Sequence, residues 1–157
     1  TRMLGYLDDP AATALAFDGD WYRSGDLARL DEDGYLFIVD RLKDLIITGG
    51  ENVYSAEVEA VLQQHPQVRE AAVVGRPHPQ WGETVVAVVV ADGELSLEDL
   101  RAFCGERLAR YKVPRDLVIA DALPRNPSGK LTKHVLREQL AAQGSAGPAL
   151  RGPAPAP

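Results

Sequence analysis

Apolar residues along the chain follow two spacings, one typical of strands and one typical of helices. Runs rich in β-branched residues predict buried strands over 45–48, 68–75, 84–91 and 113–119. Apolar residues at helical spacing predict helices over 56–65, 97–108 and 131–140. Together these elements span about 100 residues, enough for a hydrophobic core of their own. We expect a small α+β domain, in which about three helices flank a short mixed sheet.

Residues 1–40 have a different pattern. Two strand-like runs, 26–30 and 35–39, are joined by the Asp/Gly-rich segment 31–34, which predicts a β-hairpin. A lone hairpin is marginal in water, so residues 1–40 are expected to be the tail of a larger, missing N-terminal domain. Residues 41–141 then form the compact C-terminal domain. The Gly/Pro/Ala-rich residues 142–157 have little to bury and are expected to be disordered.

Composition narrows the class of protein. The net charge of −6 argues against a general nucleic-acid-binding surface. No apolar run is long enough to span a bilayer, and the sequence has no signal-peptide pattern. Cys104 is the only cysteine, and it is expected to pack as a small apolar residue instead of acting as a nucleophile. A single cysteine allows no intrachain disulfide, which favours a reducing, cytoplasmic location. The histidines are widely separated and lack the spacing of metal ligands, so no metal site is expected in this chain.

Polar motifs carry the candidate chemistry. They are YRSGD (22–26), DRLKD (40–44) followed by GGEN (49–52), and PRNPSGK (124–130). Lys130 stands on a Pro/Gly-bounded loop just before a predicted helix, where an ammonium group can neutralise a carboxylate and a phosphate together. Asp26 follows a glycine at a strand edge, where its carboxylate can accept two hydrogen bonds from a cis-diol. Taken alone, each is also explained as an ordinary turn residue.

In this order and at these distances, the motifs resemble the C-terminal end of the adenylate-forming superfamily of acyl-CoA synthetases, luciferases and peptide-synthetase adenylation domains. The resemblance covers about Leu4 to Leu140 and is closest to medium- and long-chain fatty-acyl-CoA ligases. It implies ATP-dependent formation of an acyl-AMP from a carboxylic acid, followed by transfer to coenzyme A. Two alternatives stay open: an adenylation domain that serves a carrier protein, and a non-catalytic interaction module with this fold.

The resemblance also implies roles for the adenylation step and for domain motion. Lys130 is the catalytic residue. Asp26 binds the ribose of the nucleotide, and Arg41 and Asn52 also contact the nucleotide. For Arg41, an ion pair with Asp40 or Asp44 is the alternative. Lys43 is the hinge about which the C-terminal domain turns between the two half-reactions. Ser24 departs from the usual threonine of the family but keeps the hydroxyl group.

For the CoA step, the resemblance places the pantetheine path beside Gly49, Gly50 and Glu51. Trp81 is then expected to stack on the CoA adenine, and Arg115 to meet a CoA phosphate. A cover for the edge of the core is the alternative for Trp81. Mg²⁺ is expected with ATP, with ligands mainly outside this chain. Since the phosphate loop and acyl pocket of the family precede these motifs, the chain alone is expected to be inactive.

Overall fold

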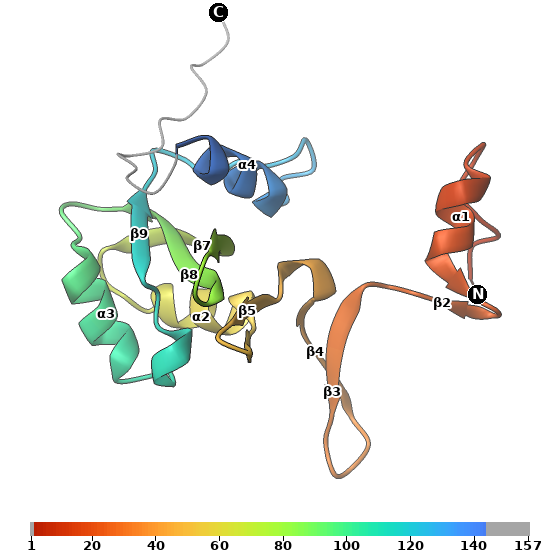
Figure 1. The fold of residues 1–157 in the computed structure, drawn as a ribbon, viewed down its shortest axis with the longest axis horizontal. Coiled ribbons are helices and arrows are strands. Elements are labelled where there is room, and N and C mark those ends of the chain that lie inside the picture. The colour runs from red at the N-terminus through yellow and green to blue at the C-terminus, as the bar shows by residue number, and fades with distance from the viewer. Residues whose placement is uncertain (1, 144–157) are drawn as a thin grey trace, which may run out of the picture. The chain divides into compact units, whose positions relative to one another are not determined.

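The computed structural model describes residues 2–143, and the chain divides into two compact units, Thr1–Lys43 and Asp44–Pro157 (Figure 1). The predicted disordered segment 142–157 lies almost wholly outside the described residues. No helix within residues 2–143 is both long and apolar enough to cross a membrane.

The first unit contains a short helix and two hairpins. Its elements are α1 (Pro10–Ala16), β1 (Phe17–Asp18), β2 (Trp21–Tyr22), β3 (Asp26–Leu30) and β4 (Leu36–Arg41). The carboxylate of Asp31 accepts hydrogen bonds from the amides of Asp33 and Tyr35, which shapes the turn between β3 and β4. Antiparallel pairing then places Asp26 directly opposite Arg41. The hairpin predicted over 26–39 is therefore present, and its second strand extends two residues further than expected.

The short η1 (Leu42–Asp44) spans the boundary, and the second unit begins at its last residue, Asp44. Within residues 44–143, a five-stranded sheet has the order β6-β5-β8-β7, and β9 pairs in parallel with β8. The strands are β5 (Ile46–Thr48), β6 (Glu51–Val53), β7 (Val68–His78), β8 (Gly82–Ala91) and β9 (Asp116–Ile119). The helices are α2 (Ser55–Leu62), α3 (Leu97–Gly105), the short η2 (Arg110–Lys112) and α4 (Lys133–Gln143).

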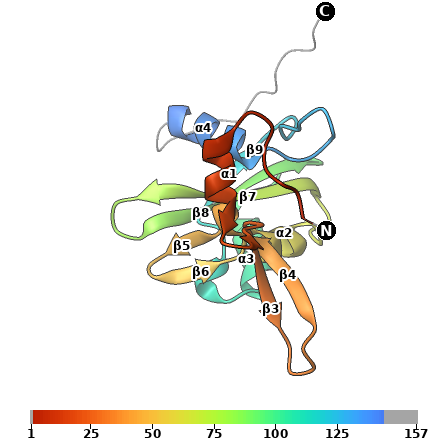
Figure 2. The ribbon, with the colours of Figure 1, turned by 90° about the vertical axis from the view of Figure 1, so that its right-hand side faces the viewer.

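Alternation along the central strands builds an apolar core on each face of the sheet. Val73 and Val85 face one cluster, which also contains Leu62 of α2 and Leu100 of α3. Their neighbours Val74, Val86 and Val88 face the other cluster, with Leu136 and Leu140 of α4. Figure 2 shows α4 on one side of the sheet and α2 and α3 on the other. The predicted α+β fold, with helices flanking a short mixed sheet, is confirmed.

The ends of several elements differ from the predictions. The first helix of this unit ends at Leu62, three residues early, because the chain turns through hydrogen bonds at residues 63–65. The last strand begins at Asp116, because its predicted start directly follows η2 and contains the buried Pro114, which has no amide hydrogen for the sheet. The last helix begins at Lys133, since Leu131 pairs with Arg125 in an isolated bridge.

Candidate functional site

The loop that carries Lys130 is organised by Asn126. The Asn126 side-chain oxygen accepts hydrogen bonds from the amides of Ser128 and Lys130 at 3.1 and 2.8 Å. The backbones of Asn126 and Lys130 are also joined, at 2.9 Å from N to O. Gly129 adopts a φ of +80°, a conformation that favours glycine. Lys130 is exposed, and its ammonium group makes no hydrogen bond or ion pair with any residue in the described part of the chain.

One ion pair fixes this loop to the body of the unit, and hydrogen bonds close the loop on itself. On one side, the Arg125 guanidinium binds Glu70 of β7 at 2.6 Å and the carbonyl of Gly129 at 2.9 Å. On the other side, Thr132 donates from its amide and its hydroxyl to the carbonyl of Pro124. The backbone that presents Lys130 is therefore pre-organised, while its ammonium group is available to a ligand.

Helix α4, which follows the loop, is held by buried charges. The Lys133 ammonium lies 2.7 Å from both the Glu59 carboxylate and the Ser55 hydroxyl of α2. Arg137 binds Asp44 at 2.7 Å, and Asp44 is only 8 % exposed. Asp44 directly follows Lys43, so the start of the second unit is tied to the helix beside the Lys130 loop.

Asp26 and Arg41, both predicted nucleotide contacts, form an ion pair in the first unit. The Arg41 Nε atom lies 3.2 Å from the Asp26 carboxylate. Asp40 accepts the backbone amide of Arg41, whereas the side chain of Arg41 pairs with Asp26. The Ser24 hydroxyl accepts from the Asp26 amide at 3.1 Å, a role that threonine would fill equally well. Asn52, the third predicted contact, lies in the second unit on the exposed strand β6.

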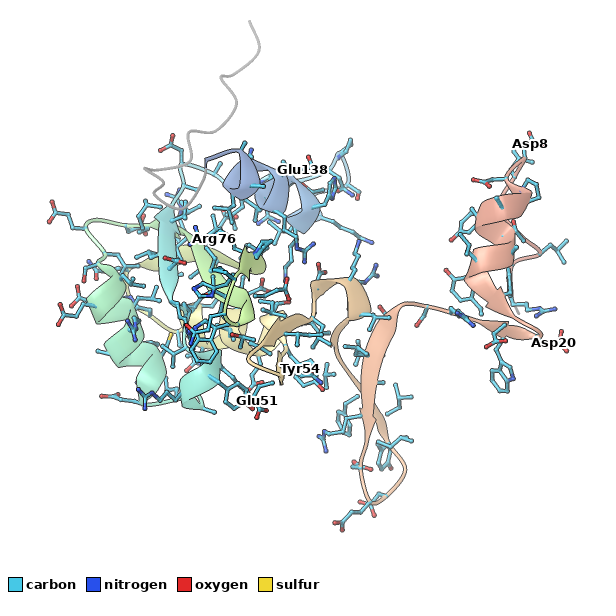
Figure 3. The ribbon with its side chains drawn as sticks, viewed as in Figure 1. Asp8, Asp20, Glu51, Tyr54, Arg76 and Glu138 are labelled. Carbon is cyan, nitrogen blue, oxygen red and sulfur yellow. The ribbon has the colours of Figure 1, made fainter. Side chains whose placement is uncertain are left out.

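Gly49 and Gly50 form the tight turn between β5 and β6. Both have positive φ, +59° and +85°, as a type I′ turn requires. A side-chain carbon on Gly49 would come within 3.2 Å of the Trp81 ring, whereas one on Gly50 would meet open space. Glu51 follows on the same hairpin, and its side chain is exposed (Figure 3). The turn therefore presents bare backbone at the surface.

The predicted CoA residues Gly49, Trp81 and Arg115 lie next to one another. The Gly49 amide donates to the Trp81 carbonyl at 2.8 Å, and the Arg115 guanidinium carbon lies 4.7 Å from the Trp81 ring centroid. His78 shapes the turn that holds Trp81, because its Nδ1 atom accepts from the amides of Gln80 and Trp81. Figure 2 shows the β5–β6 and β7–β8 turns side by side at one end of the sheet.

A groove of about 1230 Å³ runs along α3 and extends to Arg115. Arg101 and Arg110 also line it, and neither makes a hydrogen bond or ion pair within the described residues. Glu98 is the acidic residue in its lining. Arginine forks that converge on one groove are suited to phosphate groups. Sequence reasoning singled out Arg115 and missed the other two, although residues 98, 101 and 105 fall on one face of a helix.

Two residues near this groove, Lys112 and Cys104, have structural roles. The Lys112 ammonium contacts both carboxylate oxygens of Glu57 at 2.7 Å, which anchors η2 to α2 and raises the pKa of Lys112. Burial raises the pKa of the Cys104 thiol, so it packs as a small apolar residue. Residues 2–143 contain no group of His, Cys, Asp or Glu side chains able to hold a metal ion.

Comparison with known proteins supports the family resemblance that the motifs predict. Residues 57–130 match the family described as the AMP-binding enzyme C-terminal domain. The chain is 54 % identical over 138 residues to the long-chain-fatty-acid–CoA ligase FadD13 of Mycobacterium tuberculosis, covering 87 % of this chain and 27 % of that protein. It is 50 % identical over 136 residues to the 2-succinylbenzoate–CoA ligase of Bacillus licheniformis, covering 87 % and 28 %. The chain thus spans little more than a quarter of the length of these curated relatives.

Solved structures of CoA synthetases are also similar in fold to this chain. The Mycobacterium tuberculosis fatty acyl CoA synthetase matches with a TM-score of 0.67 and 53 % identity, over 88 % of this chain and 28 % of that one. The o-succinylbenzoate CoA synthetase of Bacillus subtilis, in complex with its acyl-adenylate intermediate, matches with a TM-score of 0.80 and 42 % identity, over 94 % and 29 %. The resemblance predicted from the motifs is confirmed: residues 57–130 match the AMP-binding enzyme C-terminal domain, and the relatives of the chain are CoA ligases and related adenylate-forming enzymes.

Proposed function

We propose that this chain is the C-terminal part of an AMP-forming acid–CoA ligase, most similar to fatty-acyl-CoA ligases. In the first step, a carboxylate attacks the α-phosphate of ATP, giving acyl-AMP and pyrophosphate. In the second, the CoA thiol attacks the acyl carbon and AMP leaves. Mg²⁺ is expected to accompany ATP and to take its ligands mainly from the rest of the enzyme.

One observation carries this proposal: the second unit has distinct polar surfaces at the two ends of β7. The Lys130 loop is anchored through Arg125 to Glu70, near the start of the strand. The Gly49, Trp81 and Arg115 cluster lies beyond His78, where the strand ends. At about 3.3 Å per residue, these points on β7 are roughly 25 Å apart. A domain that turns between two half-reactions requires surfaces separated in this way.

The test uses the full-length protein. We expect carboxylic-acid-dependent exchange between ATP and pyrophosphate, and AMP release when CoA is added. Absence of the exchange reaction would favour a non-catalytic module. Exchange followed by transfer only to a carrier protein would favour the peptide-synthetase alternative.

The arginine groove favours CoA over a carrier protein, because CoA carries a 3′-phosphate in addition to its pantetheine arm. We predict that Arg101→Ala and Arg110→Ala in the full-length enzyme raise KM for CoA by about 10- to 100-fold, the range for a lost charge-assisted hydrogen bond. The KM for 3′-dephospho-CoA should stay nearly unchanged. Steady-state kinetics with both acceptors measure this difference.

Arg107→Ala provides the matched control for the groove. Arg107 stacks on Phe103 and pairs with Glu106, and it does not line the groove. It should affect both acceptors alike. Equal effects of Arg101→Ala, Arg110→Ala and Arg107→Ala on the two acceptors would contradict phosphate recognition by the groove.

The boundary between the units supplies a further prediction. Lys43 ends the first unit, and the Asp44–Arg137 ion pair holds the first residue of the second. Lys43→Pro fixes φ near −65° and removes an amide hydrogen, so it should retain adenylation and lose transfer to CoA. Lys43→Ala leaves the backbone free and should be much milder. If the proline and alanine variants behave alike in both half-reactions, rotation does not occur at residue 43.

A further inference from the structure

The Glu83 side chain takes the place of a backbone acceptor where β5 meets β8. Within the described residues, these strands share one register pair, Thr48 with Gly82. Regular pairing would next join Ile47 to the backbone of Glu83. Instead, the Ile47 amide donates to the Glu83 carboxylate at 2.8 Å. The carboxylate thus continues the hydrogen-bond ladder at the point where the two backbones separate.

Gly75 makes room for this carboxylate on β7. Register places Gly75 opposite Val85, on the diagonal from Glu83 across the β7–β8 pair. A side-chain carbon on Gly75 would overlap the Glu83 carboxylate. Gly75 has no positive φ, so its backbone does not demand glycine. The space above Gly75 is occupied by Glu83, and that occupancy is the steric reason for a glycine at this position.

Three backbone contacts join the Gly49–Gly50 turn and β5 to the β7–β8 turn within the described residues. They are the Thr48–Gly82 pair, the hydrogen bond from the Gly49 amide to the Trp81 carbonyl, and the bond from the Ile47 amide to Glu83. Loss of the Glu83 bond would leave the amide of the half-exposed Ile47 to water and would loosen β5 against β8, so that β5 could shift relative to Trp81. A shift of about 1 Å is enough to affect a reaction strongly.

We infer that Glu83 is a positioning residue that sets the Gly49–Gly50 turn against Trp81 for the thioester-forming step. This inference rests on the proposed function, because the turn is taken to line the pantetheine path. Glu83 contacts no reacting atom in this role. It acts by fixing β5, in the way that outer residues fix the ligands of a metal site, where their loss typically costs about 10- to 100-fold.

The first test is Glu83→Ala beside Glu83→Gln in the full-length enzyme. Alanine should raise KM for CoA, or lower the rate of transfer from supplied acyl-AMP, by about 10-fold or more. ATP–pyrophosphate exchange should change little. Glutamine keeps an oxygen acceptor at the same place and should restore transfer to within a few-fold. Equal losses in both half-reactions, or no rescue by glutamine, would overturn the positioning role.

Gly75→Ala on β7 tests the same hydrogen bond between the Ile47 amide and the Glu83 carboxylate. Its methyl group should displace the flexible Glu83 carboxylate without disturbing the backbone, so it should reproduce the bias of Glu83→Ala. In the double variant Gly75→Ala/Glu83→Ala there is no carboxylate to displace. We therefore expect it to be no worse than Glu83→Ala alone. Additive losses would show that Gly75 acts by another route and would contradict the inference.

Hydrogen exchange separates this inference from the proposed function. In the 157-residue chain itself, Glu83→Ala should speed exchange of the Ile47 amide by about 10-fold or more, and Glu83→Gln should not. Unchanged exchange would overturn the inference whatever the enzyme does. Faster exchange with normal CoA transfer would overturn the positioning role. Faster exchange in a full-length protein that lacks all ligase activity would place the failure in the proposed function.

Discussion

Replacing Lys130 with alanine in the full-length enzyme should reduce acyl-AMP formation by about 10²–10³-fold, the usual cost of one donor to a developing charge. Thioester formation from supplied acyl-AMP should remain close to normal. This follows from the proposed role, in which the Lys130 ammonium, unpaired among the described residues, acts only while negative charge gathers at the α-phosphate. ATP–pyrophosphate exchange measures the first step, and quenched single-turnover assays with acyl-AMP measure the second.

Lys130→Arg provides the control for charge. Arginine keeps the positive charge but changes the shape and reach of the donor, so it should recover part of the lost exchange rate. The Asn126 side chain binds the backbone amide at position 130, so neither substitution removes the contacts that shape the loop. Equal losses in both half-reactions for Lys130→Ala would mean that Lys130 is structural.

Replacing Gly50 with leucine should have the opposite effect: it should slow transfer to CoA and spare acyl-AMP formation. A side chain there would enter open space on the surface of the turn, where we place the pantetheine arm of CoA. We expect acyl-AMP to form at a near-normal rate and transfer to CoA to fall by 10²-fold or more, since a misplacement of about 1 Å can cost that much. The same pair of half-reaction assays reports both rates.

The control must carry the same backbone strain, because a leucine with positive φ costs about 1–2 kcal/mol by itself. Gly34 meets this requirement. It has a φ of +84°, beside +85° at Gly50, and a side chain there also meets open space. It lies in the β3–β4 turn of the first unit. Gly34→Leu should lower stability by a similar amount and leave the ratio of the two half-reactions unchanged. A matching bias in both variants would trace the effect to strain.

The fold follows from the sequence where hydrophobic pattern alone decides the structure. The β-branched runs over 68–75 and 84–91 are buried on both faces, and they became the central strands β7 and β8. Element ends were less predictable, because they depend on local hydrogen bonds. Leu131 looked helical by spacing, yet it pairs with Arg125 to close the Lys130 loop. Arg125 is also held by Glu70, a tertiary contact that no periodicity reveals.

The residues of the candidate site also differ in whether the sequence or only the fold reveals them. Lys130, Asp26 and the Gly49–Gly50 turn stand in motifs and were found by their resemblance to a family. Arg101 and Arg110 were given no role from the sequence, and only the fold brings them to the groove with Arg115. Glu83 stands two residues after Trp81 and was given no role from the sequence, because its contact with Ile47 depends on where β5 leaves β8. Long-range contacts of this kind are set by sheet register.

The central claim is that one domain serves two half-reactions with separate surfaces. The most direct measurement is the rate of CoA thioester formation from supplied acyl-AMP in the full-length Lys130→Ala and Gly50→Leu variants. We predict that Lys130→Ala retains this rate within a few-fold and that Gly50→Leu loses 10²-fold or more. Loss of the rate in Lys130→Ala, or its retention in Gly50→Leu, would contradict the account.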